Sequence, residues 1–181
     1  MVRLTFDTNC IIDLEEQRPD SKYLREIIDA WRNKKVEVAV VAVSASENQP
    51  HGRVNETYQQ FEEKLEAVGL KGATELLPLA YWDVFYWDRA LWSNKGMEDL
   101  EEKIRNVLFP GIQTEAPKSD KEARIWRNKL CDVLVAWSHA YHQWDVLVTR
   151  DQNFHKKKEG LSRLGVKQVM YPSEAVKLCR P

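Results

Sequence analysis

Four acidic side chains could form one metal-binding centre if the fold brings them together: Asp7, Glu47, Asp132 and Asp151. Packed carboxylates raise one another's pKa unless cations compensate. Mg²⁺ and Mn²⁺ prefer oxygen ligands, and Mg²⁺ typically takes one or two carboxylates together with water and phosphate. The chain has no His or Cys spacing typical of zinc. Each acid alone is more simply explained as a solvated cap, so the metal hypothesis depends on their convergence.

The hydrophobic pattern predicts the elements that would position these acids. We expect strands at 2–6, 36–43, 75–79, 145–149 and 168–171, and helices at 22–35, 56–67, 97–108, 120–143, 153–158 and from 173 onward. This alternation predicts an α/β protein, a three-layer α/β/α sandwich with a mainly parallel central sheet. Ligand sites in such folds gather at the carboxyl ends of the strands. Asp7, Glu47 and Asp151 follow three expected strands, and Asp132 lies in the helix before the fourth.

Length and composition indicate one soluble domain. The 181 residues are 43% hydrophobic and carry a net charge of −1, which fits a single domain, 1–181, with a candidate insertion at about 81–118. No apolar run approaches the ~20 residues that cross a bilayer. No signal-peptide core precedes the first acid, and three widely separated cysteines fit a reducing compartment. We therefore expect a cytoplasmic protein without membrane contacts.

Four segments resemble, in order, the motifs of the PIN-domain nuclease family. LTFDTNCIID, residues 4–13, is similar to the opening motif, a strand that ends in Asp-Thr-Asn before an apolar helix. SASE, residues 44–47, resembles the second motif, and DVLVAWSHA, residues 132–140, resembles the third. DVLVTRDQNF, residues 145–154, is similar to the fourth, in which a strand ends in Thr-x-Asp and a Phe follows.

This resemblance implies a metal-dependent endoribonuclease that hydrolyses RNA phosphodiester bonds with Mg²⁺ or Mn²⁺. It implies that Asp7 and Asp132 ligate the metal directly, that Glu47 completes the site, and that Asp151 ligates directly or through water. A narrower interpretation is the toxin of a toxin–antitoxin pair, similar to VapC-type ribonucleases. An antitoxin or other protein partner and a homodimer are expected only by this analogy.

Three residues beside the acids are expected to support them. Thr8 and Asn9 can hold Asp7 in place, although a helix cap explains both equally well. Thr149 can orient Asp151 or a bound water, although a β-branched strand residue is the simpler explanation.

Basic residues near the motifs are candidates for contacts with substrate phosphate. Arg150, between the last strand residue and the fourth acid, is the strongest candidate. Arg127 precedes the third motif on the same helical stretch, and Lys156 begins a run of three lysines. A solvated helix face is the simpler explanation for that lysine run.

Other titratable residues are ranked below these. Asp13 is expected on a helix surface, and Asp145 at the opposite edge of the sheet from Asp151. His139 and His142 are three residues apart and could share a helix face, but the sequence supplies no further metal ligands nearby. We expect solvated or core histidines.

Two alternative functions remain open. A catalytically weak or inactive PIN-like module could keep the acids and bind RNA or protein, especially if 81–118 covers the groove. The aromatic residues Trp82, Phe85, Trp87 and Trp92 could then stack on bases, although core or partner contacts are more usual. A nucleotide-binding α/β protein is disfavoured because no Gly-rich phosphate loop occurs.

Overall fold

The computed structural model describes residues 1–45, 57–81 and 89–180. Its centre is a five-stranded, all-parallel sheet in the order β3-β2-β1-β4-β5. In chain order the elements are β1 (Val2–Phe6), α1 (Thr8–Glu15), α2 (Ser21–Arg32), β2 (Val36–Val41), the 3-10 turn η1 (Ala42–Ala45), α3 (Tyr58–Ala67), β3 (Thr74–Leu76), α4 (Lys95–Leu108), α5 (Asp120–Tyr141), β4 (Val146–Val148), α6 (Gln152–Ser162), β5 (Gln168–Met170), α7 (Pro172–Ala175) and η3 (Val176–Cys179). The predicted α/β class with a parallel sheet is confirmed.

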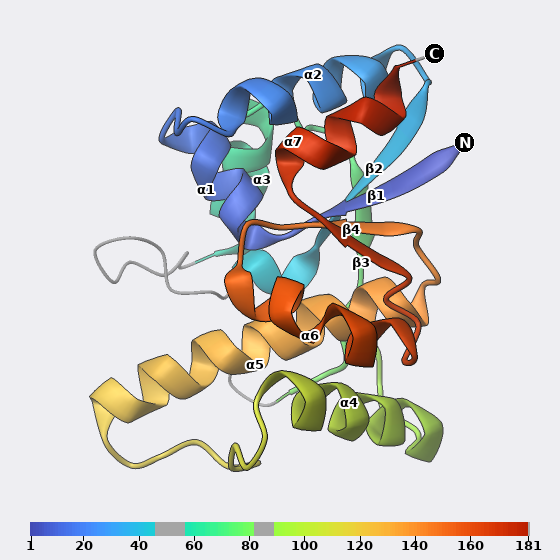
Figure 1. Ribbon diagram of the computed structural model, residues 1–181. Helices are drawn as coiled ribbons and strands as arrows, with labels where there is room; N and C mark the ends of the chain where they lie inside the picture. Colours follow the sequence, from blue (N-terminus) through green and yellow to red (C-terminus); the bar gives the residue numbers. More distant parts are fainter. Residues whose placement is uncertain (46–56, 82–88, 181) are drawn as a thin grey trace.

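Helices cover both faces of the sheet (Figure 1). The first layer contains α1, α2, α3 and α7, and the second contains α4, α5 and α6. Alternate residues of β2 serve the two layers, because Val38 and Val40 pack with the first whereas Ala39 and Val41 pack with the second. Since both faces are buried, the strand is apolar from Val38 to Val41, and only Glu37 near its start is exposed.

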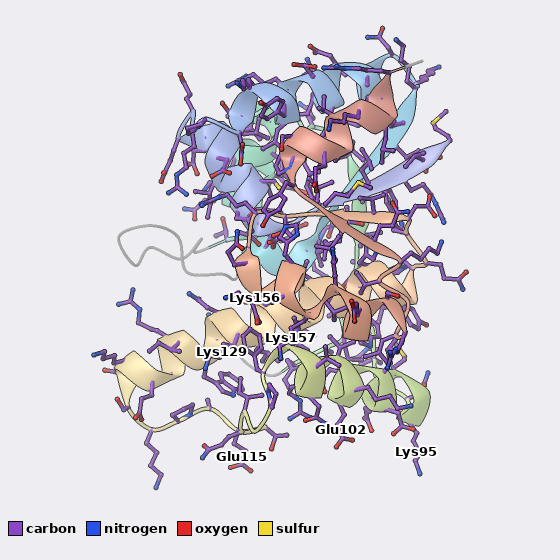
Figure 2. The ribbon with its side chains drawn as sticks, viewed as in Figure 1. Lys95, Glu102, Glu115, Lys129, Lys156 and Lys157 are labelled. Atoms are coloured by element: carbon purple, nitrogen blue, oxygen red, sulfur yellow. The ribbon has the colours of Figure 1, made fainter. Side chains whose placement is uncertain are left out.

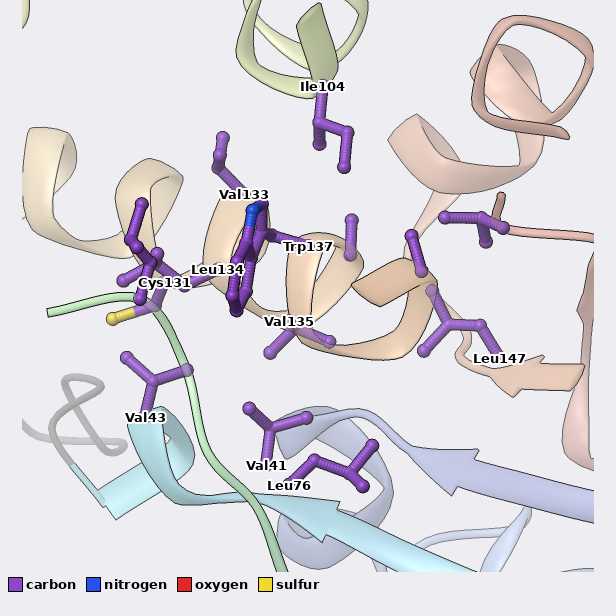
Figure 3. Close-up of a cluster of buried hydrophobic side chains, with 14 of the residues drawn as sticks. Val41, Val43, Leu76, Ile104, Cys131, Val133, Leu134, Val135, Trp137 and Leu147 are labelled. Carbon is purple, nitrogen blue, oxygen red and sulfur yellow. The ribbon is translucent and has the colours of Figure 1, made fainter. Parts of the chain in front are cut away.

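The core under the second layer is organised around Trp137 of α5. Figure 3 shows Trp137, Ile104 of α4 and Val41 of β2 within one cluster of buried side chains. The indole is 0% exposed, and its Nε1 donates to the carbonyl oxygen of Met97 at 3.0 Å. Burying an aromatic side chain of this size contributes about 3 kcal/mol. The helix α4, which lies inside the expected insertion, therefore belongs to the core.

The strand order creates a switch point between β1 and β4. The chain proceeds from β1 outward to β2 and β3, and then crosses to β4 and β5 on the other side of β1. Phe6 pairs with Val148, and the backbone N–H of Asp7 donates to the Val148 carbonyl at 3.1 Å. Ligands of open α/β sheets bind outside the carboxyl ends of the strands at such a point. Residues that follow β1 and β4 must therefore meet there.

Most expected elements are present with shifted ends. The strand expected at 36–43 ends at Val41, because the next four residues form η1. The expected 120–143 helix is α5, which is 22 residues long and carries charged residues through its first half. Neither α5 nor any other helix in the described parts of the chain has the length and apolar character needed to cross a membrane.

Candidate functional site

Asp7 is the first residue after β1, and its carboxylate is held by three donors. Its Oδ1 accepts from the backbone N–H of Thr8 at 2.7 Å. Its Oδ2 accepts from the Thr149 hydroxyl at 2.7 Å and from the Asn9 side-chain amide. Asp7 is only 2% exposed. Because a carboxylate with several donors has one preferred orientation, the three bonds fix the direction in which Asp7 points.

The Thr149 hydroxyl connects the ends of β1 and β4. Besides donating to Asp7, it accepts from Asn9 Nδ2 at 2.8 Å and from the backbone N–H of Asp151 at 3.0 Å. A hydroxyl has one donor and two acceptor positions, so all of its hydrogen-bonding capacity is used. Asn9 thus contacts the Asp7 carboxylate, whereas Thr149 contacts Asp151 through the backbone N–H of that residue.

Burial makes the charge of Asp7 costly. Loss of hydration is the largest cause that raises its pKa, and the nearby negative charge of Asp151 raises it further. The hydrogen bonds from Thr149 and Thr8 and the positive charge of Arg150 oppose this shift. The balance raises the pKa from 3.8 to about 6. Asp7 is therefore a buried acid whose protonation changes slightly below neutral pH, and a nearby cation would favour its charged form.

Asp151 follows β4 in the same way that Asp7 follows β1. It caps α6, and its Oδ1 accepts from the backbone N–H of Asn153 at 2.6 Å. Capping alone accounts for this bond. Capping does not account for Asp7, which also begins a helix, because a cap does not need to be buried or to accept from Asn9 and Thr149.

Only one of the remaining two candidate ligands lies within the described residues. Asp132 is partly buried in α5, and Glu47 lies outside the described residues. Within 1–45, 57–81 and 89–180, no three Asp, Glu, His or Cys side chains are arranged to hold a metal ion. Asp7 and Asp151 supply two carboxylates, which fits a Mg²⁺ ion that also binds water and phosphate. Asp7 Oδ2 already accepts two bonds, which leaves Oδ1 as its freer oxygen.

The prediction that Asp13 lies on a helix surface is wrong. Its side chain is 1% exposed, and it lies between two arginines. Asp13 Oδ2 is 2.9 Å from Arg150 Nε, and Asp13 Oδ1 is 3.3 Å from Arg18 Nη1. Asp13 faces inward because it lies one helical turn after Asn9, on the side of α1 that meets the segment after β4. Arg150, expected to contact phosphate, therefore has an internal partner.

The other expected phosphate contacts lie on the second layer. Lys156 is exposed on the first half of α6 (Figure 2). Arg127 is partly buried on α5. Neither location tests a role in binding phosphate.

The lower-ranked residues are structural. Asp145 directly precedes β4 at the opposite edge and binds Arg3 and Lys167, whose hydrogen bonds hold its pKa well below the usual range. His139 is buried, with Nδ1 2.9 Å from Thr5 Oγ1, whereas His142 bonds to a backbone carbonyl. His139 is thus a core histidine, and burial lowers its pKa from 6.5 to about 3.

Two contacts at the site were not anticipated. The Thr8 hydroxyl donates to Ser44 Oγ at 2.8 Å, which joins α1 to the end of β2. The His155 ring stacks on Tyr171 with centroids 3.6 Å apart, and its Nε2 lies 2.9 Å from the Thr149 carbonyl oxygen. The Thr8–Ser44 and His155–Tyr171 contacts join different elements of the fold, so local spacing gives no signal for them.

The comparisons neither support nor exclude the expected family. The fold class and the contacts around Asp7 come from the structure itself. Comparison of the chain with protein-family models, with curated proteins and with solved structures gives no match.

Proposed function

We propose that this protein is a Mg²⁺- or Mn²⁺-dependent endoribonuclease of the PIN type, acting at the carboxyl ends of β1 and β4. The observation that carries the proposal is the Asp7 carboxylate, buried at the switch point beside Asp151 and held by three donors. The motif resemblance around Asp7 and Asp151 supplies the reaction class.

The energetics of Asp7 support a functional role. An ionisable side chain at 2% exposure destabilises the fold at neutral pH, and its pKa of about 6 reflects that cost. A serine or asparagine could cap α1 without a buried charge. Strongly perturbed acids of this kind gather at functional sites.

Asp7 and Asp151 would hold the proposed cation, with Asp132 and Glu47 as the other expected ligands. When bound, it lowers the pKa of a water molecule and offsets charge on the scissile phosphate. Asn9 and Thr149 keep the Asp7 carboxylate in one orientation, so little reorganisation accompanies binding.

The direct test compares RNA cleavage by wild type, Asp7→Asn and Asp99→Asn with Mg²⁺, with Mn²⁺ and with chelator. Asp99 is an exposed acid on α4 and serves as the matched carboxylate-to-amide control. We expect wild type and Asp99→Asn to cleave only with metal, and Asp7→Asn to lose about a hundredfold or more. Cleavage by Asp7→Asn at the wild-type rate would refute the proposal.

A second readout follows the metal without RNA. Mn²⁺ that binds only the folded chain raises the thermal unfolding midpoint in a concentration-dependent way. We expect this rise for wild type and for Asp99→Asn, but not for Asp7→Asn. An equal rise of the unfolding midpoint in all three proteins would show that Mn²⁺ binds at a site that does not include Asp7.

A PIN-like binding module without catalysis is the second candidate. It is favoured by the finding that no three-acid group forms within the described residues, and by the two bonds that already occupy Asp7 Oδ2. RNA binding by wild type without any cleavage in Mn²⁺, and with the same affinity in Asp7→Asn, would support the module.

An antitoxin-type inhibitor and a homodimer belong to the enzyme proposal. Gel filtration of the purified chain tests the dimer.

A further inference from the structure

Two residues of α1 hold Arg150 at both its backbone and its side chain. Asn9 Oδ1 accepts from the Arg150 backbone N–H at 3.2 Å. Asp13 Oδ2 lies 2.9 Å from Arg150 Nε. Asn9 and Asp13 are four residues apart, so they share one face of α1. Figure 1 shows the segment from β4 to α6 passing beside α1.

In the Asp13–Arg150 pair, the carboxylate is buried and the guanidinium is accessible to solvent. The Asp13 side chain is 1% exposed, whereas the Arg150 side chain is 39% exposed. A buried carboxylate is strongly destabilising unless a cation lies next to it. Asp13 therefore fixes where the Arg150 guanidinium lies, but it does not remove that group from solvent.

The donors of Arg150 are largely unused. The 2.9 Å approach of Nε to Asp13 Oδ2 lacks the alignment of a hydrogen bond, so the contact is mainly one of charge. Within the described residues, the two terminal nitrogens of Arg150 make no hydrogen bond. Arginine presents such nitrogens as a planar fork that matches two oxygens of a phosphate.

We propose that Asp13 is a positioning residue that holds Arg150 so that the outer edge of its guanidinium binds a backbone phosphate of single-stranded RNA next to Asp7 and Asp151. The inference rests on the proposed function for its choice of substrate. Arg150 stands between Thr149 and Asp151 in the chain, and its positive charge opposes the burial that raises the pKa of Asp7. A phosphate bound there would lie at the end of the strand pair.

The test measures binding of a short fluorescein-labelled oligoribonucleotide by anisotropy, with chelator present so that no metal-dependent cleavage occurs. Dissociation constants are recorded between about 50 and 200 mM salt, because each phosphate contact to a single strand contributes about 0.7 to the salt slope. We expect Arg150→Ala to reduce the slope by about 0.7 and Arg150→Lys to retain it.

Arg18→Ala is the matched control. Arg18 is the second arginine on Asp13, and its side chain is 35% exposed, close to the 39% of Arg150. Its loss perturbs the same buried carboxylate from the other side. We expect wild-type salt dependence for Arg18→Ala, together with some loss of stability.

The role of Asp13 is isolated by a double-mutant cycle. We expect Asp13→Asn to weaken RNA binding about fivefold in the wild-type background and to have no further effect when Arg150 is already alanine. Asp13→Glu, which keeps the charge, should restore part of the affinity. Circular dichroism checks that each variant is folded.

The outcomes separate this inference from the proposed function. An Arg150→Ala variant with unchanged salt slope, or an Asp13→Asn effect that persists without Arg150, overturns the positioning role and leaves a purely structural ion pair. RNA binding that follows the expected pattern, in a protein that cleaves nothing with Mn²⁺, supports the inference and removes the nuclease proposal.

Discussion

Replacing Asp7 by asparagine should change the pH dependence of stability. Burial raises the pKa of Asp7 from 3.8 in the unfolded chain to about 6 in the folded one. Between these values the folded state binds more protons than the unfolded state, so wild-type stability falls as pH rises from about 4 through about 6. The asparagine variant has no ionisable group at this position, so its stability should not show this fall with rising pH.

The structure sets the size of the effect. A pKa that moves from 3.8 to about 6 changes by about 2 units, which corresponds to about 3 kcal/mol of lost stability at neutral pH. Asp7 is 2% exposed, so solvent screening reduces this little. The amide must place its NH₂ group against the N–H of Thr8 or against Asn9 and Thr149, which costs about 1–2 kcal/mol at every pH. The variant should therefore be less stable than wild type by about 1–2 kcal/mol near pH 4, and more stable by a similar amount above about pH 7.

Urea denaturation of both proteins across this range, with chelator present, measures the difference. Asp99→Asn is the control, and its difference from wild type should not change with pH, because Asp99 is exposed on α4. A constant difference between Asp7→Asn and wild type from about pH 4 to about pH 7 would refute the reasoning, since it would mean that Asp7 titrates at its ordinary pKa.

Three further predictions follow from single contacts. Thr149→Val should cost about 2–4 kcal/mol in urea denaturation, because it leaves the buried Asp7 with one donor fewer and the partly buried amide of Asn9 with one acceptor fewer. A cost below ~0.5 kcal/mol would contradict the network. Burial lowers the pKa of His139 from 6.5 to about 3, so the free energy of unfolding should fall by about 1.4 kcal/mol per pH unit as pH drops below about 6.5. His139→Gln should lose less stability than wild type on acidification. Identical stability-versus-pH profiles for the two proteins would contradict this prediction. Trp137→Ala should lower stability by about 3–5 kcal/mol in thermal or urea unfolding, and a loss under ~1 kcal/mol would show that the core around it readjusts.

The end of β1 could be predicted from local pattern alone. The run 2–6 is apolar at alternate positions and is followed at once by Asp7, and β1 has those bounds in the structure. Thr149 and Asp151 follow a second apolar run in the same manner. Both patterns depend only on the burial of parallel strands and on the residues that begin helices. The sequence therefore located these residues at strand ends.

Asp13 shows where local pattern is insufficient. Its spacing from Asn9 places both on one face of α1, but the sequence does not say what that face meets. The partner is Arg150, which is 137 positions later and lies nearby only because β4 pairs with β1. The ion pair could be assigned only after the strand order was known.

By itself, the sequence determined the alternation of strands and helices and the residue types at the strand ends, because both follow from interactions between near neighbours in the chain. Only the tertiary structure decided that β4 lies beside β1, that Thr149 binds Asp7, and that Asp13 is buried against Arg150. The physical reason is that burial and ion pairing depend on distances in space. Here those distances are set by strand pairing between segments that lie more than a hundred residues apart.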